Sequence, residues 1–317
     1  MSTTTKRPSI RIQPRDIKIF YWLYKLRFLT AHQIAGLVEA VEEKVANPNY
    51  RFRQGHDAVI ERINLLKKAG YLNHLTKPFQ KYVYTLGPKA VDVLILEKGI
   101  LREEIYHVLE QKKRSEKHLE HALMVAEFGA TLALACKKRP DVKLIVWLPE
   151  SNELEIETVI PESHITDVMQ KWKKDGKLKL KKKPDAIFGL EDPKGKMFFM
   201  LEADRGTMTA NRFLQKMVAY YYFLAQDQFY NWSLEKRIHP EVKPIKKFRV
   251  ITYTVTPQWQ RTLMNITLQA TPGNRGSKMF WFTNQILVDS ERAGTIFKPV
   301  FFIAQDNEID KRHSVLE

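Results

Sequence analysis

The order of helical and extended patterns in the N-terminal part of the chain is the feature that most constrains its fold. Pro14 is suited to the first position of a helix, and Ile17, Phe20 and Tyr24 then recur at three- and four-residue spacing. Thr30 is a suitable N-cap for a second, short helix. The spacing predicts a third helix from about Asp57 to Ala69, and residues 39–49 between the last two helices are expected to form a loop.

Two strand patterns follow the third helix directly. Gly70 is placed to end the helix, residues 71–75 predict one strand, and residues 81–86 predict its return partner across a turn that contains Pro78. Three helices followed by a two-stranded wing, in this order, predict a winged helix-turn-helix.

The remaining pattern divides the chain into four parts. Residues 1–13 are expected to form a flexible basic arm, residues 14–98 the winged helix, residues 99–115 a helical connector and residues 116–317 a second domain. A chain of 317 residues is long enough for two domains with separate cores.

The second domain combines helices with strongly apolar strands. A long helix over 116–138 is followed by predicted strands over 142–148, 185–190, 197–203 and 248–255, and a helix over 211–224 lies between the last two strands. This succession predicts an α/β (α+β) fold in which helices flank a mixed sheet.

The charge of the chain is strongly positive, with a formal net charge of +16 and a pI of about 9.6. Residues 1–115 carry 21 Lys or Arg and 11 Asp or Glu, and the Lys171–Lys183 run carries eight lysines and one aspartate. Such an excess favours a polyanionic partner, double-stranded DNA first. The lysine run is equally consistent with a phosphate-binding loop and with a solvated excursion.

The third helix of a winged helix enters the major groove, so its start and its exposed side carry the candidate DNA contacts. Gln54, His56 and Asp57 lie at its predicted start, with Arg62 on the side expected to be exposed. Other basic residues are suited to phosphates or, near the helix end, to capping its dipole. The candidate DNA-binding residues are Arg51, Arg53, Gln54, His56, Arg62, Lys67, Lys77 and Lys81.

Three carboxylates of the second domain are expected to converge at one end of the sheet. Glu202 and Asp204 point to the same side of one strand because side chains alternate, and Asp185 precedes the neighbouring strand. Glu127 on the long helix could add a fourth carboxylate. Such oxygen ligands suit Mg²⁺ or Mn²⁺, which can activate water against a phosphodiester.

This pattern resembles the PD-(D/E)xK restriction-endonuclease-like superfamily, which implies a metal-dependent nuclease with Asp185, Glu202 and Asp204 as metal and catalytic residues. The superfamily has lysine where this chain has Asp204. Lys216 on the following helix could supply the amine from a displaced position, and Arg205 is another cation nearby. The alternative is that these are ordinary strand-end carboxylates in an inactive descendant.

Several segments together resemble the replication-relaxation family over roughly residues 12–255. They include Phe28–Ile34, Arg62–Leu72, the Pro184-Asp185-Ala186-Ile187-Phe188 segment and the Glu202-Ala203-Asp204-Arg205-Gly206-Thr207 segment. The resemblance implies a role in the replication and DNA relaxation of plasmids or other mobile elements.

Three functions therefore compete. The first is DNA binding in service of a mobile element's replication, relaxation or mobilisation, together with other replication or mobilisation proteins. The second is an Mg²⁺-dependent endonuclease or nickase, and the third a winged-helix transcriptional regulator. We expect a cytoplasmic protein with no membrane partner, because the N-terminus lacks an apolar stretch and no run approaches the ~20 apolar residues of a span.

Overall fold

The computed structural model describes residues 10–38, 52–75, 82–109, 116–149, 155–235 and 245–317. The chain divides into two compact units, Met1–Leu134 and Ala135–Glu317. The division falls inside the long helix α7 (Glu116–Lys138), whereas the sequence places the domain boundary at residues 115/116. Most of α7 therefore groups with the N-terminal unit.

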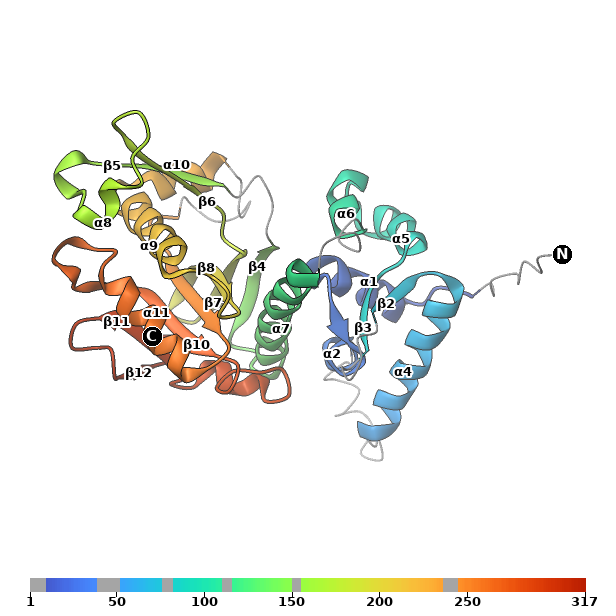
Figure 1. Ribbon diagram of the computed structural model, residues 1–317. Coiled ribbons are helices and arrows are strands. Elements are labelled where there is room, and N and C mark those ends of the chain that lie inside the picture. The colour runs from blue at the N-terminus through green and yellow to red at the C-terminus, as the bar shows by residue number, and fades with distance from the viewer. Residues whose placement is uncertain (1–9, 39–51, 76–81, 110–115, 150–154, 236–244) are drawn as a thin grey trace. The chain divides into compact units, whose positions relative to one another are not determined.

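The first unit follows the order of elements expected from its sequence (Figure 1). A three-stranded antiparallel sheet has the order β1-β3-β2, in which β3 pairs with both neighbours. The elements are α1 (Pro14–Leu26), β1 (Leu29–Thr30), α2 (Ala31–Val38), α4 (Phe52–Ala69), β2 (Leu72–Leu75), β3 (Val83–Leu86), α5 (Pro88–Lys98) and α6 (Arg102–Leu109).

The predicted apolar faces form the core of this unit. Ile19, Phe20 and Leu23 of α1 are fully buried, as are Ile63 and Leu66 of α4. The third helix begins at Phe52, five residues before its expected start at Asp57, so a turn that was expected to precede the helix belongs to it. The loop expected over residues 39–49 lies outside the described residues.

A seven-stranded mixed sheet forms the centre of the second unit, in the order β12-β11-β10-β9-β8-β7-β4. The neighbours β8, β9 and β10 are parallel, and every other pair of adjacent strands is antiparallel. The strands are β4 (Lys143–Pro149), β7 (Ala186–Asp192), β8 (Gly195–Asp204), β9 (Arg249–Thr254), β10 (Gly276–Asn284), β11 (Phe301–Gln305) and β12 (Arg312–His313).

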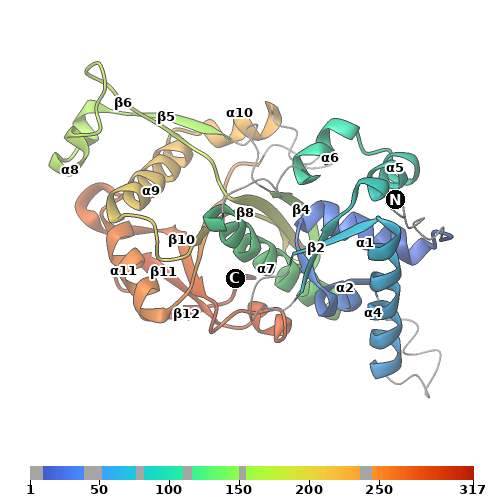
Figure 2. The same ribbon diagram turned by 45° about the vertical axis from the view of Figure 1, so that its right-hand side comes forward.

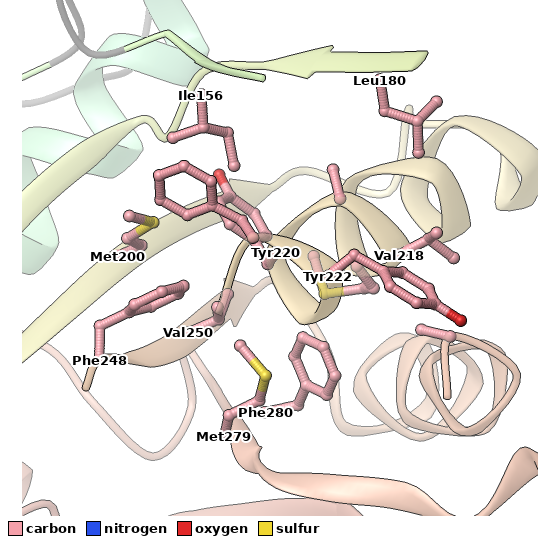
Figure 3. Close-up of a cluster of buried hydrophobic side chains, with 14 of the residues drawn as sticks. Ile156, Leu180, Met200, Val218, Tyr220, Tyr222, Phe248, Val250, Met279 and Phe280 are labelled. Carbon is pink, nitrogen blue, oxygen red and sulfur yellow. The ribbon is translucent and has the colours of Figure 1, made fainter. Parts of the chain in front are cut away.

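Two helices pack against each other beside this sheet, α9 (Ala210–Ala225) and α11 (Pro257–Leu268). A separate hairpin of β5 (Ile156–Ile160) and β6 (Leu178–Lys182) lies against α9, and the short helix α8 (Asp167–Gln170) is in its connection. Ile156 and Leu180 of this hairpin join Met200, Val218 and other side chains in one buried cluster (Figure 3). The helix α10 (Gln228–Glu235) follows α9.

Over His118–Lys138 the long helix α7 has the length and composition of a membrane span, although the sequence was expected to contain no apolar run of that length. Within its most apolar window, 67% of the helix is buried inside the protein. Core helices of soluble proteins meet the same criterion, so the helix is weak support for a membrane segment.

Candidate functional site

Apart from Arg62, the predicted DNA-contact residues fall in three places. Arg53, Gln54 and His56 lie within the first turns of α4, so Arg53 does not precede the helix as expected. Lys67 and Lys68 lie in its last turn, where Lys67 is half-buried and Lys68 exposed. The other candidates, Arg51, Lys77 and Lys81, lie outside the described residues.

Arg62 differs most from its expected place on the exposed side of the third helix. Its guanidinium donates hydrogen bonds from Nε and Nη2 to the carboxylate of Asp16, at 3.0 and 2.6 Å, and a further one from Nη2 to the backbone oxygen of Arg11 at 2.7 Å. Its side chain is only 12% exposed, and that of Asp16 is completely buried. Arg62 therefore has a structural role, because its guanidinium neutralises the buried Asp16 carboxylate.

The acidic residues of the second unit are positioned by the β7–β8 hairpin. Asp185 directly precedes β7, and its backbone N–H donates to the oxygen of Leu201 on β8 at 2.9 Å. In return, its carboxylate Oδ2 accepts the backbone N–H of Ala203 at 2.7 Å. These bonds fix the Asp185 carboxylate beside the C-terminal end of β8, next to Glu202.

Glu202 lies at the centre of a buried cluster that we call the Glu202 cluster: Asp185, Glu202, Lys216 and Tyr220. Its carboxylate accepts a hydrogen bond from Lys216 Nζ on one oxygen and from the Tyr220 hydroxyl on the other. Lys216 Nζ is also 3.9 Å from Oδ1 of Asp185. The structure thus brings together Asp185, Glu202 and the displaced lysine, as the sequence suggested.

The helix α9 supplies both partners of Glu202 from one face. Thr209 caps its N-terminus by accepting the backbone N–H of Arg212 at 3.4 Å, and Gly206, with a φ of 78°, allows the chain to turn back after β8. Lys216 and Tyr220 are four residues apart, so they lie one above the other on the helix. Tyr220 was not among the site residues expected from the sequence; the four-residue spacing is the signal that links it to Lys216.

Burial dominates the electrostatics of this cluster. It raises the pKa of the Glu202 carboxyl to about 7; the Lys216 ammonium opposes the rise and the Asp185 charge adds to it. Burial also raises the pKa of the Tyr220 hydroxyl, and the adjacent Glu202 charge contributes. Tyr220 and Lys216 are therefore the hydrogen-bond donors to a carboxyl group whose pKa burial raises.

One lysine of the Lys171–Lys183 run lies next to the Glu202 cluster. Lys182, at the end of β6, donates from Nζ to Oε1 of Gln215 at 3.0 Å. Its pKa is lowered by burial and by the positive charges of Lys216 and Arg212, while Glu202 raises it. Other lysines of the Lys171–Lys183 run form ion pairs with glutamates of the same hairpin region, namely Lys173 with Glu162, Lys179 with Glu157, and Lys181 with Glu155 and Glu157.

Asp204 does not join the Glu202 cluster in the way expected. Its side chain is buried, and Oδ2 accepts a hydrogen bond from the indole nitrogen of Trp259 in the first turn of α11. The cause is the parallel pairing of β8 with β9, which places Asp204 opposite Thr254 and thus beside the start of α11. A carboxylate at this position is also favoured by the positive end of the helix dipole.

Glu127 is likewise not a fourth member of the cluster. It lies on the part of α7 that belongs to the first unit, and its Oε2 accepts a hydrogen bond from Gln33 Nε2 at 2.6 Å. Gln33 is nearly fully buried on α2, and its Oε1 accepts the backbone N–H of Thr30 at 2.8 Å. Glu127 therefore connects α7 to the start of α2.

These contacts decide whether the donor set fits Mg²⁺ or Mn²⁺. Lys216 and Tyr220 engage both oxygens of Glu202, and Asp204 faces Trp259 instead of the other two acids. Within the described ranges, no group of three or more His, Cys, Asp or Glu side chains is placed to hold a metal ion. The expected three-carboxylate metal site is therefore not assembled, and this arrangement does not fit the ion.

Comparison with curated proteins and with solved structures finds no match. A family described as replication-relaxation matches residues 20–233, a range that runs from α1 through the Glu202 cluster to α10. The match covers more than half of the 317 residues and includes elements of both units. The chain therefore belongs to the replication-relaxation family.

Proposed function

We propose that this chain is a double-stranded DNA-binding protein that acts in the replication, relaxation or mobilisation of a plasmid or other mobile element. The observation that carries the proposal is the element order α1-β1-α2-α4-β2-β3 with a β1-β3-β2 sheet, which is the order of a winged helix-turn-helix. The net charge of +10 over residues 1–115 and the family's description support it. Its site of action is then the cytosol, beside other replication or mobilisation proteins.

The test measures the affinity of the full-length protein for duplex DNA by fluorescence anisotropy at a series of salt concentrations. Binding that relies on phosphate contacts should weaken steeply as salt rises. Lys67→Glu with Lys68→Glu should weaken binding to all duplexes, whereas Lys298→Glu, an exposed lysine of the second unit, should have little effect. Equal losses in both variants, or no duplex binding at low salt, would contradict the proposal.

The location of the bound sites distinguishes this role from that of a transcriptional regulator. A replication or mobilisation factor should select duplexes from a replication or transfer origin, and a regulator should select promoters. Genome-wide recovery of the bound DNA from cells that carry the element separates the two.

Metal-dependent cleavage is the alternative enzymatic function, as in a restriction-endonuclease-like domain. The meeting of Asp185, Glu202 and Lys216 supports it, and the engagement of both Glu202 oxygens opposes it. Incubation of supercoiled plasmid with the protein and Mg²⁺ or Mn²⁺ is the direct assay. Nicking that is lost in Asp185→Asn while DNA binding persists would establish cleavage.

A further inference from the structure

One face of α4 is open to solvent along most of the helix. The exposed residues follow one another at intervals of one and three positions, which is the spacing of a single helical face. They are Asp57, Ala58, Glu61, Asn64, Leu65 and Lys68, and Leu65 is 44% exposed although it is a large apolar residue. Figure 2 shows α4 at one side of its unit, with its long axis along the edge.

This face differs in chemistry from a surface that binds phosphates alone. It carries two carboxylates, Asp57 and Glu61, against one ammonium, Lys68, so its formal charge is negative in a strongly basic unit. Carboxylates repel the phosphate backbone, but they accept hydrogen bonds from the exocyclic amine of cytosine in the major groove. The amide of Asn64 can bond adenine at both N6 and N7.

The spacing of Glu61 and Asn64 is close enough to that of stacked bases for the two side chains to reach different base pairs. Three residues of an α-helix advance about 4.5 Å along its axis, and successive bases of one strand are about 3.4 Å apart. Their side chains lie on adjacent turns of the same face, so they can reach neighbouring base pairs. Ala58 and Leu65 flank them and provide apolar contacts of the kind that thymine methyl groups accept.

Arg62, which was the expected reading residue, is turned inward. Its bonds to Asp16 join α4 to the start of α1, and together with the buried Ile63 and Leu66 they determine which residues α4 presents to solvent. Arg62 is thus a positioning residue, and the residues beside it on the outer face are the ones that can touch bases.

We propose that Asn64 and Glu61 determine the sequence specificity of this protein, with Asn64 selecting adenine and Glu61 selecting cytosine at neighbouring base pairs. The inference rests on the proposed binding of double-stranded DNA. Asn64 and Glu61 discriminate between DNA sequences, whereas the basic residues supply affinity for any sequence.

The experiment starts with selection of duplexes from a random library by the full-length wild-type protein. Anisotropy with the selected duplex and with single-base variants then measures base preference for the wild type, Asn64→Ala and Glu61→Gln. Asn265→Ala is the matched control, since it removes an exposed asparagine from the helix α11 of the other unit. Thermal unfolding verifies that each variant is folded.

We expect Asn64→Ala to lose roughly 5- to 150-fold of the preference for adenine at one position, and Glu61→Gln to lose preference for cytosine at the next. Affinity for random duplex should change little in Asn64→Ala and rise in Glu61→Gln, which removes a negative charge. If the wild type binds duplex DNA and both variants keep its base preferences, this inference alone is overturned. That result is expected if the exposed face of α4 binds a protein. Failure of the wild type to bind any duplex would overturn the proposed function itself.

Discussion

Arg62 of α4 and Asp16 of α1 form an ion pair in which two nitrogens of the guanidinium bond the two oxygens of the carboxylate. Asp16 also accepts the backbone N–H of Gln13 at 2.8 Å, so the same carboxylate caps the first turn of α1. The two residues are 46 positions apart in the chain. One buried carboxylate thus orients both the first helix and the helix that we propose to enter DNA.

We expect Arg62→Ala to lower the free energy of unfolding of the N-terminal unit by about 2–4 kcal/mol, because it leaves the Asp16 carboxylate buried without its ionic partner. Chemical denaturation of the full-length protein measures the loss. Arg102→Ala is the control, since Arg102 pairs with Asp92 where both side chains are more than half exposed and should cost less than about 1 kcal/mol. Similar losses in both variants would show that the Arg62 pair has no special structural role.

The helical periodicity of α4 predicted its core side correctly but not the direction of Arg62. Ile63 and Leu66 define the buried stripe, and Arg62 lies at its border, where a long side chain can turn either way. Its direction depends on Asp16, a contact between two helices that no local pattern contains. The predicted start of the helix was five residues too late, because residues 52–56 lack a strong apolar periodicity.

Strand alternation and the short hairpin predicted most of the Glu202 cluster. They placed Asp185 beside Glu202, and the helical segment that follows suggested Lys216 as the displaced amine. The place of Asp204 was not predictable, because it depends on the parallel pairing of β8 with a strand that begins 45 residues after β8 ends. That pairing brings Trp259 to Asp204, and only the tertiary fold contains this information.

The raised pKa of Glu202 predicts a pH dependence of stability in the second unit. Its pKa is about 7 in the folded protein, against an ordinary value of 4.5. The folded state therefore binds more protons than the unfolded state between these values, so stability should fall by up to roughly 3 kcal/mol as the pH rises from 4.5 to 7 and should change little above. Urea denaturation at fixed ionic strength measures this slope.

Glu202→Gln should flatten the slope, since an amide has no proton to exchange in this range. Unfolding can be followed by tryptophan fluorescence, because five of the six tryptophans lie in the second unit. An unchanged slope in this variant would assign the pH dependence to other groups.

A buried hydroxyl beside the cluster leads us to expect a substitution that stabilises the protein. Thr252 of β9 is the register partner of Glu202, is completely buried, and its hydroxyl oxygen has no hydrogen-bond partner among the described residues. Replacing an unpaired buried hydroxyl by a methyl group of similar shape removes a desolvation cost, so Thr252→Val should raise stability by about 1 kcal/mol.

Thr283→Val is the matched control for this substitution. Thr283 is also a fully buried strand residue, but its hydroxyl donates to the backbone oxygen of Val300 at 3.0 Å. The control should lose about 1 kcal/mol because the carbonyl is left with one bond fewer. If thermal unfolding shows a loss in both variants, the Thr252 hydroxyl has a partner such as a buried water.

Removal of Lys216 tests whether its ammonium takes the place of a metal ion. In the wild type, Nζ contacts Glu202 and is 3.9 Å from Asp185, so it neutralises the two carboxylates together. Lys216→Ala should lower the melting temperature, because two acids then share a buried site without a cation. Millimolar Mg²⁺ or Mn²⁺ should restore part of this loss in Lys216→Ala and leave the wild type unchanged, since an ion stabilises the state that binds it.

The control is Lys182→Ala, which removes a neighbouring lysine that bonds Gln215 and should gain no such response to metal. If either ion stabilises the wild type as well, a metal ion can displace the Lys216 ammonium from the two carboxylates. Metal-dependent cleavage would then be the favoured function of the second unit.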